Sequence, residues 1–234
     1  MLGHRTRLPV RRQAQCGLSL VELMVGLAVG LFVVAGAATL VTTQLGDNRR
    51  LLLETQLQQD LRSSADIIAR DLRRAGYVDN ADAGVWAPAL AAPAPNRNNG
   101  VTVSGTDQVE YKYRRFNGAN ENYGFKLDSS TRALKIKIDA ATASWQDLTD
   151  ARTMRVESLS IAADNAPQLI LPCPKLCLDG TDSCWPRIVV RGFVVDIEGR
   201  AVSDNTVRRK LRTQVRLRND WVRFVDPTAP ICPI

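Results

Sequence analysis

The sequence predicts an α+β fold in which a long N-terminal α-helix packs on a C-terminal antiparallel β-sheet domain. Three observations lead to this prediction: an apolar run that begins at residue 18, an apolar stripe at helical spacing behind it, and short strand-like runs after residue 100. A chain of 234 residues has room for one sizeable core and an extension. We therefore expect one globular domain preceded by a helical extension.

The first helical segment is apolar over the length of a membrane span. From Leu23 to Val41 the chain has 19 residues, of which only Thr39 is polar. At about 1.5 Å per residue this run extends roughly 28 Å, close to the thickness of the hydrocarbon core of a bilayer. It therefore predicts a membrane-spanning helix and is too long for the core of a cleaved secretory signal.

The excess positive charge lies ahead of this span. The formal net charge is +7, from 31 basic and 24 acidic residues. The first 17 residues contain no acid and four arginines, so without them the tally is 27 against 24, or +3. These arginines are Arg5, Arg7, Arg11 and Arg12. The positive-inside rule then places the N-terminus in the cytoplasm and everything after about Val41 outside.

Beyond the span the pattern becomes amphipathic. Apolar residues recur at steps of three and four along one stripe, which consists of Leu53, Leu57, Leu61, Ala65, Ile68 and Leu72. Arg73 and Arg74, followed by Gly76, predict the end of the helix. We expect a continuous helix from Leu18 to Ala75, roughly 87 Å long at 1.5 Å per residue. Its second half presents the stripe to the globular domain.

Residues 79–100 are predicted to form a loop, because they contain three prolines and no hydrophobic period. Short strand-like runs separated by turn residues follow, at 108–116, 124–128, 133–139, 155–164 and 169–172. We expect a hairpin of strands 187–197 and 208–218, joined through 198–206. The second strand alternates, with Leu211, Thr213, Val215 and Leu217 on one face and Arg212, Gln214, Arg216 and Arg218 on the other.

Four cysteines follow the apolar run: Cys173, Cys177, Cys184 and Cys232. An even number outside the cytoplasm fits two disulfides, for which three connectivities are possible. We expect Cys232 to tie the C-terminal tail to the loop from Cys173 to Cys184. No metal site is expected, because the C-x3-C spacing has no histidine nearby and the compartment is oxidising.

The chain after residue 17 contains no histidine, because the single His4 precedes it. This excludes Ser-His and Cys-His catalytic pairs, and neither a paired-acid motif nor a phosphate-binding glycine loop stands out. We therefore expect no enzyme activity, no catalytic residues and no cofactor. The basic strand face near the C-terminus has no aromatic platform beside it, so nucleic acid is not an expected partner.

The junction between the basic head and the apolar run is distinctive. The head ends in Gly17, and the run starts at Leu18 as "LSLVEL" with a lone acid, Glu22. This stretch resembles a type IV prepilin. Further along, "RDLRRAGY" resembles the helix end of PilW-type minor pilins and J-type pseudopilins, and "MRVESLSI" and "VRLRND" resemble the PilW-type minor pilins. In type IV prepilins a peptidase cuts after the glycine and methylates the new terminal amine. The resemblance therefore implies cleavage between Gly17 and Leu18, although the family usually has phenylalanine at the first mature position.

The resemblance implies a cleaved leader at 1–17, a transmembrane or filament-core half-helix at 18–41, an amphipathic half at 42–76 and a periplasmic antiparallel β domain at 77–234. It implies a minor type IV pilin, a structural subunit that helps initiate pilus assembly near the tip. Its partners would be other minor pilins, the major pilin, the prepilin peptidase and the inner membrane. The alternatives are a J-type pseudopilin of type II secretion and a membrane-anchored module that binds DNA or a surface.

Glu22 needs a partner at the edge of a bilayer, since a charge at mid-bilayer costs of order 2–3 kcal/mol. Cleavage at Gly17 would create one, because the glutamate of one subunit can approach the terminal amine of its neighbour. Alternatively, Glu22 only complements the helix dipole, an interaction worth about 0.3–1 kcal/mol. Within the same span Gly26 and Gly30 form a GxxxG pair, which permits close packing of two helices.

Overall fold

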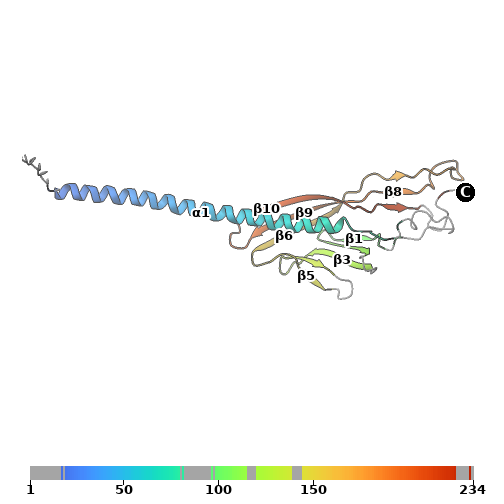
Figure 1. Ribbon diagram of the computed structural model, residues 1–234, viewed down its shortest axis with the longest axis horizontal. Coiled ribbons are helices and arrows are strands. Elements are labelled where there is room, and N and C mark those ends of the chain that lie inside the picture. The colour runs from blue at the N-terminus through green and yellow to red at the C-terminus, as the bar shows by residue number, and fades with distance from the viewer. Residues whose placement is uncertain are drawn as a thin grey trace, which may run out of the picture. The chain divides into compact units, whose positions relative to one another are not determined.

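The computed structural model describes residues 17, 19–79, 81, 96, 98–114, 120–138, 144–224 and 232. It contains one long helix, α1 (Leu20–Leu72), followed by antiparallel strands (Figure 1). The predicted α+β class, with an N-terminal helix and a C-terminal antiparallel β domain, is confirmed. The chain divides into two compact units, Met1–Arg49 and Arg50–Ile234, and α1 contributes residues to both.

The described strands of the β domain form three antiparallel sheets. The first has the order β1-β2-β3-β4-β5, formed by β1 (Val101–Ser104), β2 (Gln108–Arg114), β3 (Asn120–Leu127), β4 (Leu134–Lys137) and β5 (Trp145–Asp147). The second has the order β10-β9-β6, formed by β6 (Met154–Ala163), β9 (Gly192–Ala201) and β10 (Arg208–Arg216). The third has the order β11-β8-β7, formed by β7 (Leu169–Ile170), β8 (Arg187–Val189) and β11 (Trp221–Arg223).

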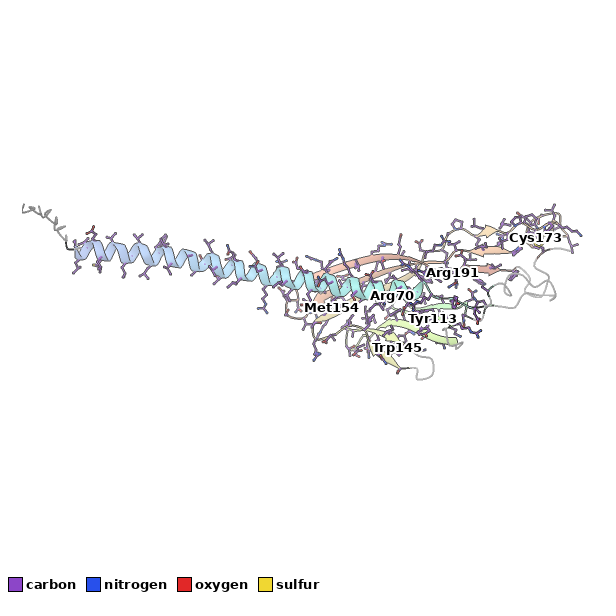
Figure 2. All side chains as sticks on the ribbon, in the orientation of Figure 1. Arg70, Tyr113, Trp145, Met154, Cys173 and Arg191 are labelled. Atoms are coloured by element: carbon purple, nitrogen blue, oxygen red, sulfur yellow. A yellow bond between two sulfur atoms is a disulfide. The ribbon has the colours of Figure 1, made fainter. Side chains whose placement is uncertain are left out.

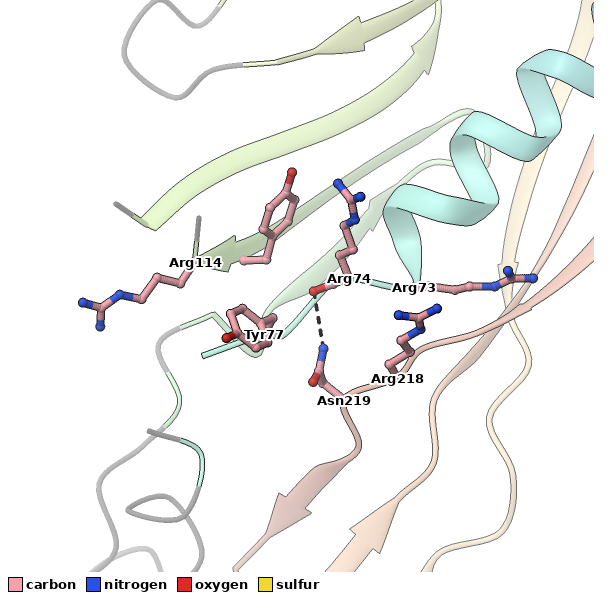
Figure 3. Close-up of a pocket in the computed structure, with 7 residues that line it drawn as sticks. Arg73, Arg74, Tyr77, Arg114, Arg218 and Asn219 are labelled. Atoms are coloured by element: carbon pink, nitrogen blue, oxygen red, sulfur yellow. Dashed lines mark hydrogen bonds between the residues drawn. The ribbon is translucent and has the colours of Figure 1, made fainter. Parts of the chain in front are cut away.

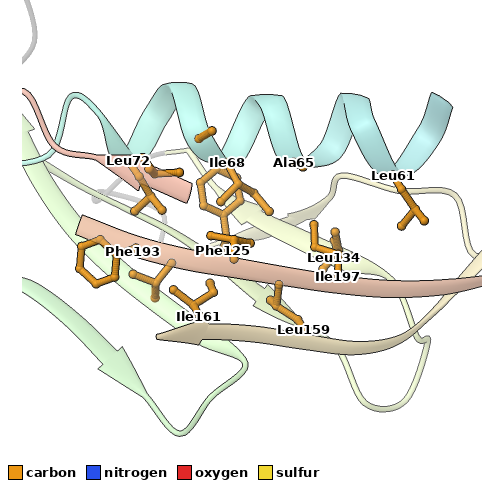
Figure 4. Packing of buried hydrophobic residues seen from close by; sticks show 14 of the residues in the cluster. Leu61, Ala65, Ile68, Leu72, Phe125, Leu134, Leu159, Ile161, Phe193 and Ile197 are labelled. Carbon is orange, nitrogen blue, oxygen red and sulfur yellow. The ribbon is translucent and has the colours of Figure 1, made fainter. Parts of the chain in front are cut away.

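The apolar stripe predicted on α1 forms one side of the hydrophobic core. Five of its residues are buried and Leu53 is partly buried; the five are Leu57, Leu61, Ala65, Ile68 and Leu72. Figure 4 shows Leu61, Ile68 and Leu72 pointing from α1 toward core side chains of the sheets. Burial of each large aliphatic side chain contributes about 1.5–3 kcal/mol, so this stripe is a main source of the domain's stability.

A charged contact extends this packing toward the start of the second unit. Glu54 on α1 accepts a hydrogen bond from Arg50 Nε at 3.2 Å and another from Arg209 Nη2 on β10. Since Glu54 is largely covered, with a side chain 21% exposed, these bonds are only partly screened by solvent. The helix is therefore joined to β10 by a polar contact as well as by the apolar stripe.

The end of α1 is set by a glycine in the left-handed conformation. Helical structure stops at Leu72, three residues before the predicted Ala75, and Gly76 follows with φ +80°. Gly76 N–H donates to Lys112 C=O at 2.8 Å, which joins the chain to the first sheet. Asn219 Nδ2 donates to Ala75 C=O at 3.0 Å. The glycine predicted as the helix stop therefore has this role, and a side-chain amide from the far end of the sequence completes the cap.

The prediction of one strand over residues 187–197 is wrong. The chain forms β8 and β9 in two different sheets, with a break at Val190 and Arg191. Arg191 is only 7% exposed, and its guanidinium donates to Asn99 C=O at 2.6 Å and to Asn219 C=O at 2.9 Å. Burial lowers the pKa of Arg191. The buried guanidinium fixes the place where the chain passes from one sheet to the next.

The predicted hairpin of the last two long strands is confirmed. β9 and β10 pair in antiparallel register from Gly192↔Arg216 to Arg200↔Arg208. The predicted alternation along β10 is confirmed as well, with Val215 on the covered face and Arg216 on the exposed one. The connection is shorter than expected, because residues 198–201 belong to β9. Three short strands, β1, β5 and β11, were not among the predicted runs, and most of the predicted loop lies outside the described residues.

We predict that Gly76→Ala destabilises the domain more than Gly180→Ala does. Both glycines have positive φ, so each substitution costs about 1–2 kcal/mol in backbone strain. A Cβ at Gly76 would also lie 2.8 Å from Arg191 Nη2, whereas at Gly180 it would meet open space. Displacing Arg191 weakens charge-assisted hydrogen bonds worth about 1.5–3 kcal/mol each.

Urea unfolding of the full chain in detergent micelles measures this difference. We expect Gly76→Ala to lose at least about 1 kcal/mol more free energy of unfolding than Gly180→Ala, given that partial relaxation recovers some of the bonds to Arg191. If both variants lose the same free energy of unfolding, the close approach of Gly76 and Arg191 does not contribute to stability.

Candidate processing and assembly site

The N-terminal junction leads directly into the helix. Gly17 is exposed, and a Cβ built on it would meet nothing within 4 Å. Leu18 lies outside the described residues, and α1 begins at Leu20. Leu23 N–H donates to Ser19 C=O at 3.1 Å, so Ser19 is the N-cap of the helix. None of the described residues therefore covers Gly17.

Glu22 lies in the first turn of α1 with an exposed side chain. No hydrogen bond or ion pair of this carboxylate is found among the residues that the structure describes. Its position near the N-terminal end of the helix is favourable, because the dipole places partial positive charge there. A closer counter-charge for Glu22 must come from outside these residues, either from another molecule or from a newly formed chain end.

The surface of α1 behind Glu22 is apolar on every side. Between Leu20 and Val41 the large apolar side chains are 54–82% exposed, and Figure 2 shows side chains around the whole circumference of this part of the helix. Among the described residues, α1 is the one helix long and apolar enough to cross a membrane. An uncovered apolar surface of this extent requires lipid or other apolar helices around it.

Gly26 and Gly30 lie four residues apart and so share a face of α1. At both positions a Cβ would meet nothing within 4 Å, so the helix surface is open there. Small residues at this spacing let a second helix backbone approach closely in an apolar medium. The geometry therefore permits the helix contact predicted from the GxxxG pattern, without identifying the second helix.

The four cysteines form two disulfides in the second unit. One bond joins Cys173 to Cys232, 59 residues apart, and the other joins Cys177 to Cys184, seven residues apart. Figure 2 places Cys173 close to the ends of the strands of the third sheet. The structure thus selects one of the three connectivities that the sequence left open. In it, the C-terminal tail is tied to the segment between β7 and β8.

Inside the smaller disulfide loop, Asp179 organises the backbone. Its carboxylate accepts hydrogen bonds from Thr181 N–H at 3.0 Å, from Thr181 Oγ1 at 2.7 Å and from Ser183 Oγ at 3.0 Å. These bonds hold the pKa of Asp179 below its usual value. The loop is therefore shaped by its own short-range bonds. It exposes the apolar side chain of Leu178, and Leu176, just before the loop, is exposed as well.

Comparison with known families identifies the N-terminal part of the chain. The prokaryotic N-terminal methylation motif matches residues 12–38, a range that contains Gly17, Leu18 and Glu22. A chain with this motif at the start of a long helix, followed by an antiparallel β domain, is a type IV pilin-like protein. The same range carries the apolar helix surface, which indicates membrane anchoring.

A second family model, described as Prepilin peptidase-dependent protein B, matches residues 50–217, which is 168 of the 234 residues. The chain belongs to this family. Membership implies processing by a prepilin peptidase and a role as a pilin or pseudopilin subunit, which is structural rather than enzymatic. Searches of curated proteins and of solved structures returned no match to this chain.

The structure does not join the predicted site residues into one site. Gly17, Glu22, Gly26 and Gly30 belong to the first unit, and the cysteines belong to the second. Sequence reasoning also missed a group of arginines near the end of α1 that come from three distant parts of the chain. The double arginines at 73–74 and 114–115 were the available signal, but their spacing does not predict that they meet.

We predict that losing the long-range disulfide destabilises the domain more than losing the short one. With sequence separations of 59 and 7 residues, the loop-closure model assigns about 4 and about 2 kcal/mol to the two bonds. The test compares a Cys173→Ser/Cys232→Ser variant with a Cys177→Ser/Cys184→Ser variant by urea unfolding. If the second variant loses as much free energy of unfolding as the first, or more, the long-range disulfide does not contribute more to stability and the prediction is wrong.

Proposed function

We propose that this chain is a minor type IV pilin that helps initiate pilus assembly in a complex with other minor pilins. The observation that carries the proposal is the methylation motif at residues 12–38, which includes Gly17 and Glu22 and lies at the start of a helix whose apolar surface the described residues leave uncovered. Residues 70–77 resemble both PilW-type minor pilins and J-type pseudopilins, and residues 154–161 resemble PilW-type minor pilins, which supports a minor subunit of this kind. A J-type pseudopilin of type II secretion is the second candidate, because it shares the processing motif and the fold class.

The proposal includes a topology. The arginines ahead of the apolar run keep the leader in the cytoplasm, and residues 18–41 span the inner membrane before assembly. The β domain then lies in the periplasm, and the two disulfides are compatible with that oxidising compartment. Cleavage after Gly17 leaves Leu18 as the first residue of the mature chain, and the subunit then passes into the pilus near its tip.

Glu22 has a specific role in this proposal. Cleavage gives Leu18 a positively charged amine, four residues before Glu22. In a bundle of parallel helices, the carboxylate of one subunit approaches the amine of its neighbour in a low-dielectric surrounding, where an unpaired charge is costly. Gly26 and Gly30 lie on the same helix just behind this pair, where close approach of a second helix is sterically open. Pairing of the two charges would thus determine how far neighbouring helices slide relative to each other.

We predict that Glu22→Gln leaves cleavage intact but reduces assembly. The variant keeps the leader, Gly17 and the apolar run, so mass spectrometry should find a mature chain beginning at Leu18, as in wild type. The neighbour's amine loses its counter-charge, so recovery of partner pilins and the number of surface pili should fall several-fold. Ser19→Ala is the matched control, because it removes a polar side chain at the N-cap position, where such a loss costs at most about 1 kcal/mol, without removing a charge.

The comparison separates two roles of Glu22. If Glu22 only complements the helix dipole, Glu22→Gln and Ser19→Ala should both assemble almost normally. Strains that lack the gene should be scored in parallel for surface pili and for secretion of exoproteins. Lost secretion with normal piliation would replace the minor-pilin proposal by the pseudopilin alternative, and a mature chain that begins elsewhere than Leu18 would contradict the processing step itself.

A further inference from the structure

A basic pocket lies at the C-terminal end of α1, within the unit Arg50–Ile234. Its volume is about 550 Å³. It is lined by residues from the end of the helix, from β2 and from the segment after β10: Arg73, Arg74, Tyr77, Tyr113, Arg114, Arg218 and Asn219 (Figure 3). Four arginines thus line one cavity, although they come from positions up to 145 residues apart in the sequence.

Two of the four arginines have partners in the described structure. Arg114 Nη1 lies 2.8 Å from Asp79 Oδ1, and Arg74 Nη1 lies 4.0 Å from Asp71 Oδ1. Burial raises the pKa of Asp71, although the neighbouring arginines oppose this shift. The Asp71 carboxylate is therefore a weak counter-ion for Arg74, at a distance too long for a hydrogen bond.

Arg73 and Arg218 differ from Arg74 and Arg114 in the partners of their guanidinium groups. Among the residues that the structure describes, neither guanidinium has a hydrogen bond or an ion pair. The two residues are neighbours, because Arg218 N–H donates to Arg73 C=O at 3.1 Å, and Figure 3 shows both side chains on the same side of the helix end. Two exposed cations beside each other repel, and an anion bound between them would remove this repulsion.

Capping of the helix does not account for this arrangement. Cations near a helix C-terminus are favourable, which explains Arg73 and Arg74 but not the arginines from the strands. The last carbonyls of the helix end already accept hydrogen bonds. Arg73 C=O accepts from Arg218 N–H, Arg74 C=O from Tyr77 N–H at 3.1 Å, and Ala75 C=O from Asn219 Nδ2. The guanidinium groups therefore remain available for another acceptor.

The pocket also has an aromatic wall. Tyr113 is buried and stacks on Tyr123, with ring centroids 4.2 Å apart, while Tyr77 is 47% exposed. Tyr113 is thus held in place by packing, and Tyr77 presents a free edge to solvent. A ligand that fits this pocket combines negative charge with a chain or side chain that packs against a tyrosine ring.

Much of the positive charge on the neighbouring sheet is paired with acids. On the sheet β10-β9-β6, four arginines have acidic partners: Arg200 and Arg208 with Glu157, Arg212 with Asp196 and Arg216 with Asp220. A site for single-stranded nucleic acid follows the backbone over about 4–16 nucleotides and needs a basic groove of that length. Because four arginines of this sheet are paired with acids, the described residues do not form a continuous unpaired basic groove of that length, and the charge distribution favours a short anionic segment.

We propose that this pocket binds an acidic segment of a partner protein. The guanidinium groups of Arg73 and Arg218 contact its carboxylates, for which the planar arginine fork is suited. Tyr77 packs against the segment, and Arg114 and Arg74 add longer-range attraction. This inference does not depend on whether the chain serves a pilus or a secretion system, because it concerns a surface of the β domain.

The test uses the full chain in detergent micelles and a fluorescent hexaglutamate peptide, with binding followed by anisotropy at low salt. We expect saturable binding by wild type and at least tenfold weaker binding by Arg73→Gln/Arg218→Gln. The matched control is Arg208→Gln/Arg212→Gln, which removes the same charge from exposed positions on β10. The peptide affinity of this control should stay within about twofold of wild type, since salt screens the attraction between the peptide and exposed charges far from the pocket.

Three results would overturn the proposal: no saturable peptide binding by wild type, equal losses in the two double variants, or tighter binding of oligothymidylate than of hexaglutamate. The last result would assign the pocket to nucleic acid. Thermal unfolding checks that both variants fold. If the glutamine pair does not fold, Arg73→Lys/Arg218→Lys replaces it, and the expected result is a several-fold weaker peptide affinity, because lysine keeps the charge but lacks the bidentate fork.

Discussion

The packing of one apolar stripe of α1 on the sheets is the interaction on which the rest of the structure depends. From Leu57 to Leu72 the helix is covered by its own domain, with Leu61, Ile68 and Leu72 fully buried. From Leu20 to Val41 the same helix exposes apolar side chains on every side. The two halves of one helix thus require different environments. The second half packs into the core of the β domain, and the first half requires lipid or neighbouring helices around it.

The place where the stripe ends determines the remaining architecture. At Gly76 the chain turns in a left-handed conformation that only glycine adopts without strain, and the buried Arg191 lies directly against it. Arg191 and Asn219 connect the helix end to the crossing between two sheets and to the segment after β10. The same convergence brings Arg73 next to Arg218 and so creates the basic pocket. A structural junction and a candidate binding surface therefore share one set of contacts.

Features with a local, periodic signal could be predicted from the sequence. The stripe from Leu57 to Leu72 and the hairpin of β9 and β10 are examples, because they follow from the spacing of apolar residues. The helix stop at Gly76 is another, because basic residues followed by glycine are typical of a helix end. The break at Arg191 could not be predicted, since a single arginine in an apolar run reads as a solvent-facing strand residue. The strands β1, β5 and β11 are only three or four residues long, too short to establish an alternation. The disulfide pairing and the pocket depend on tertiary contacts between distant segments, which spacing does not encode.

The most direct test of this account is hydrogen exchange along α1 in the full chain, reconstituted in phospholipid nanodiscs and followed through urea unfolding. The account predicts that amides of residues 57–72 lose protection together with those of β9, because the stripe is held by the domain core. Amides of residues 20–41 should stay protected at the same urea concentration, because the bilayer covers them. Simultaneous loss of protection over both halves would contradict the central claim, as would protection over 57–72 that persists after β9 has exchanged.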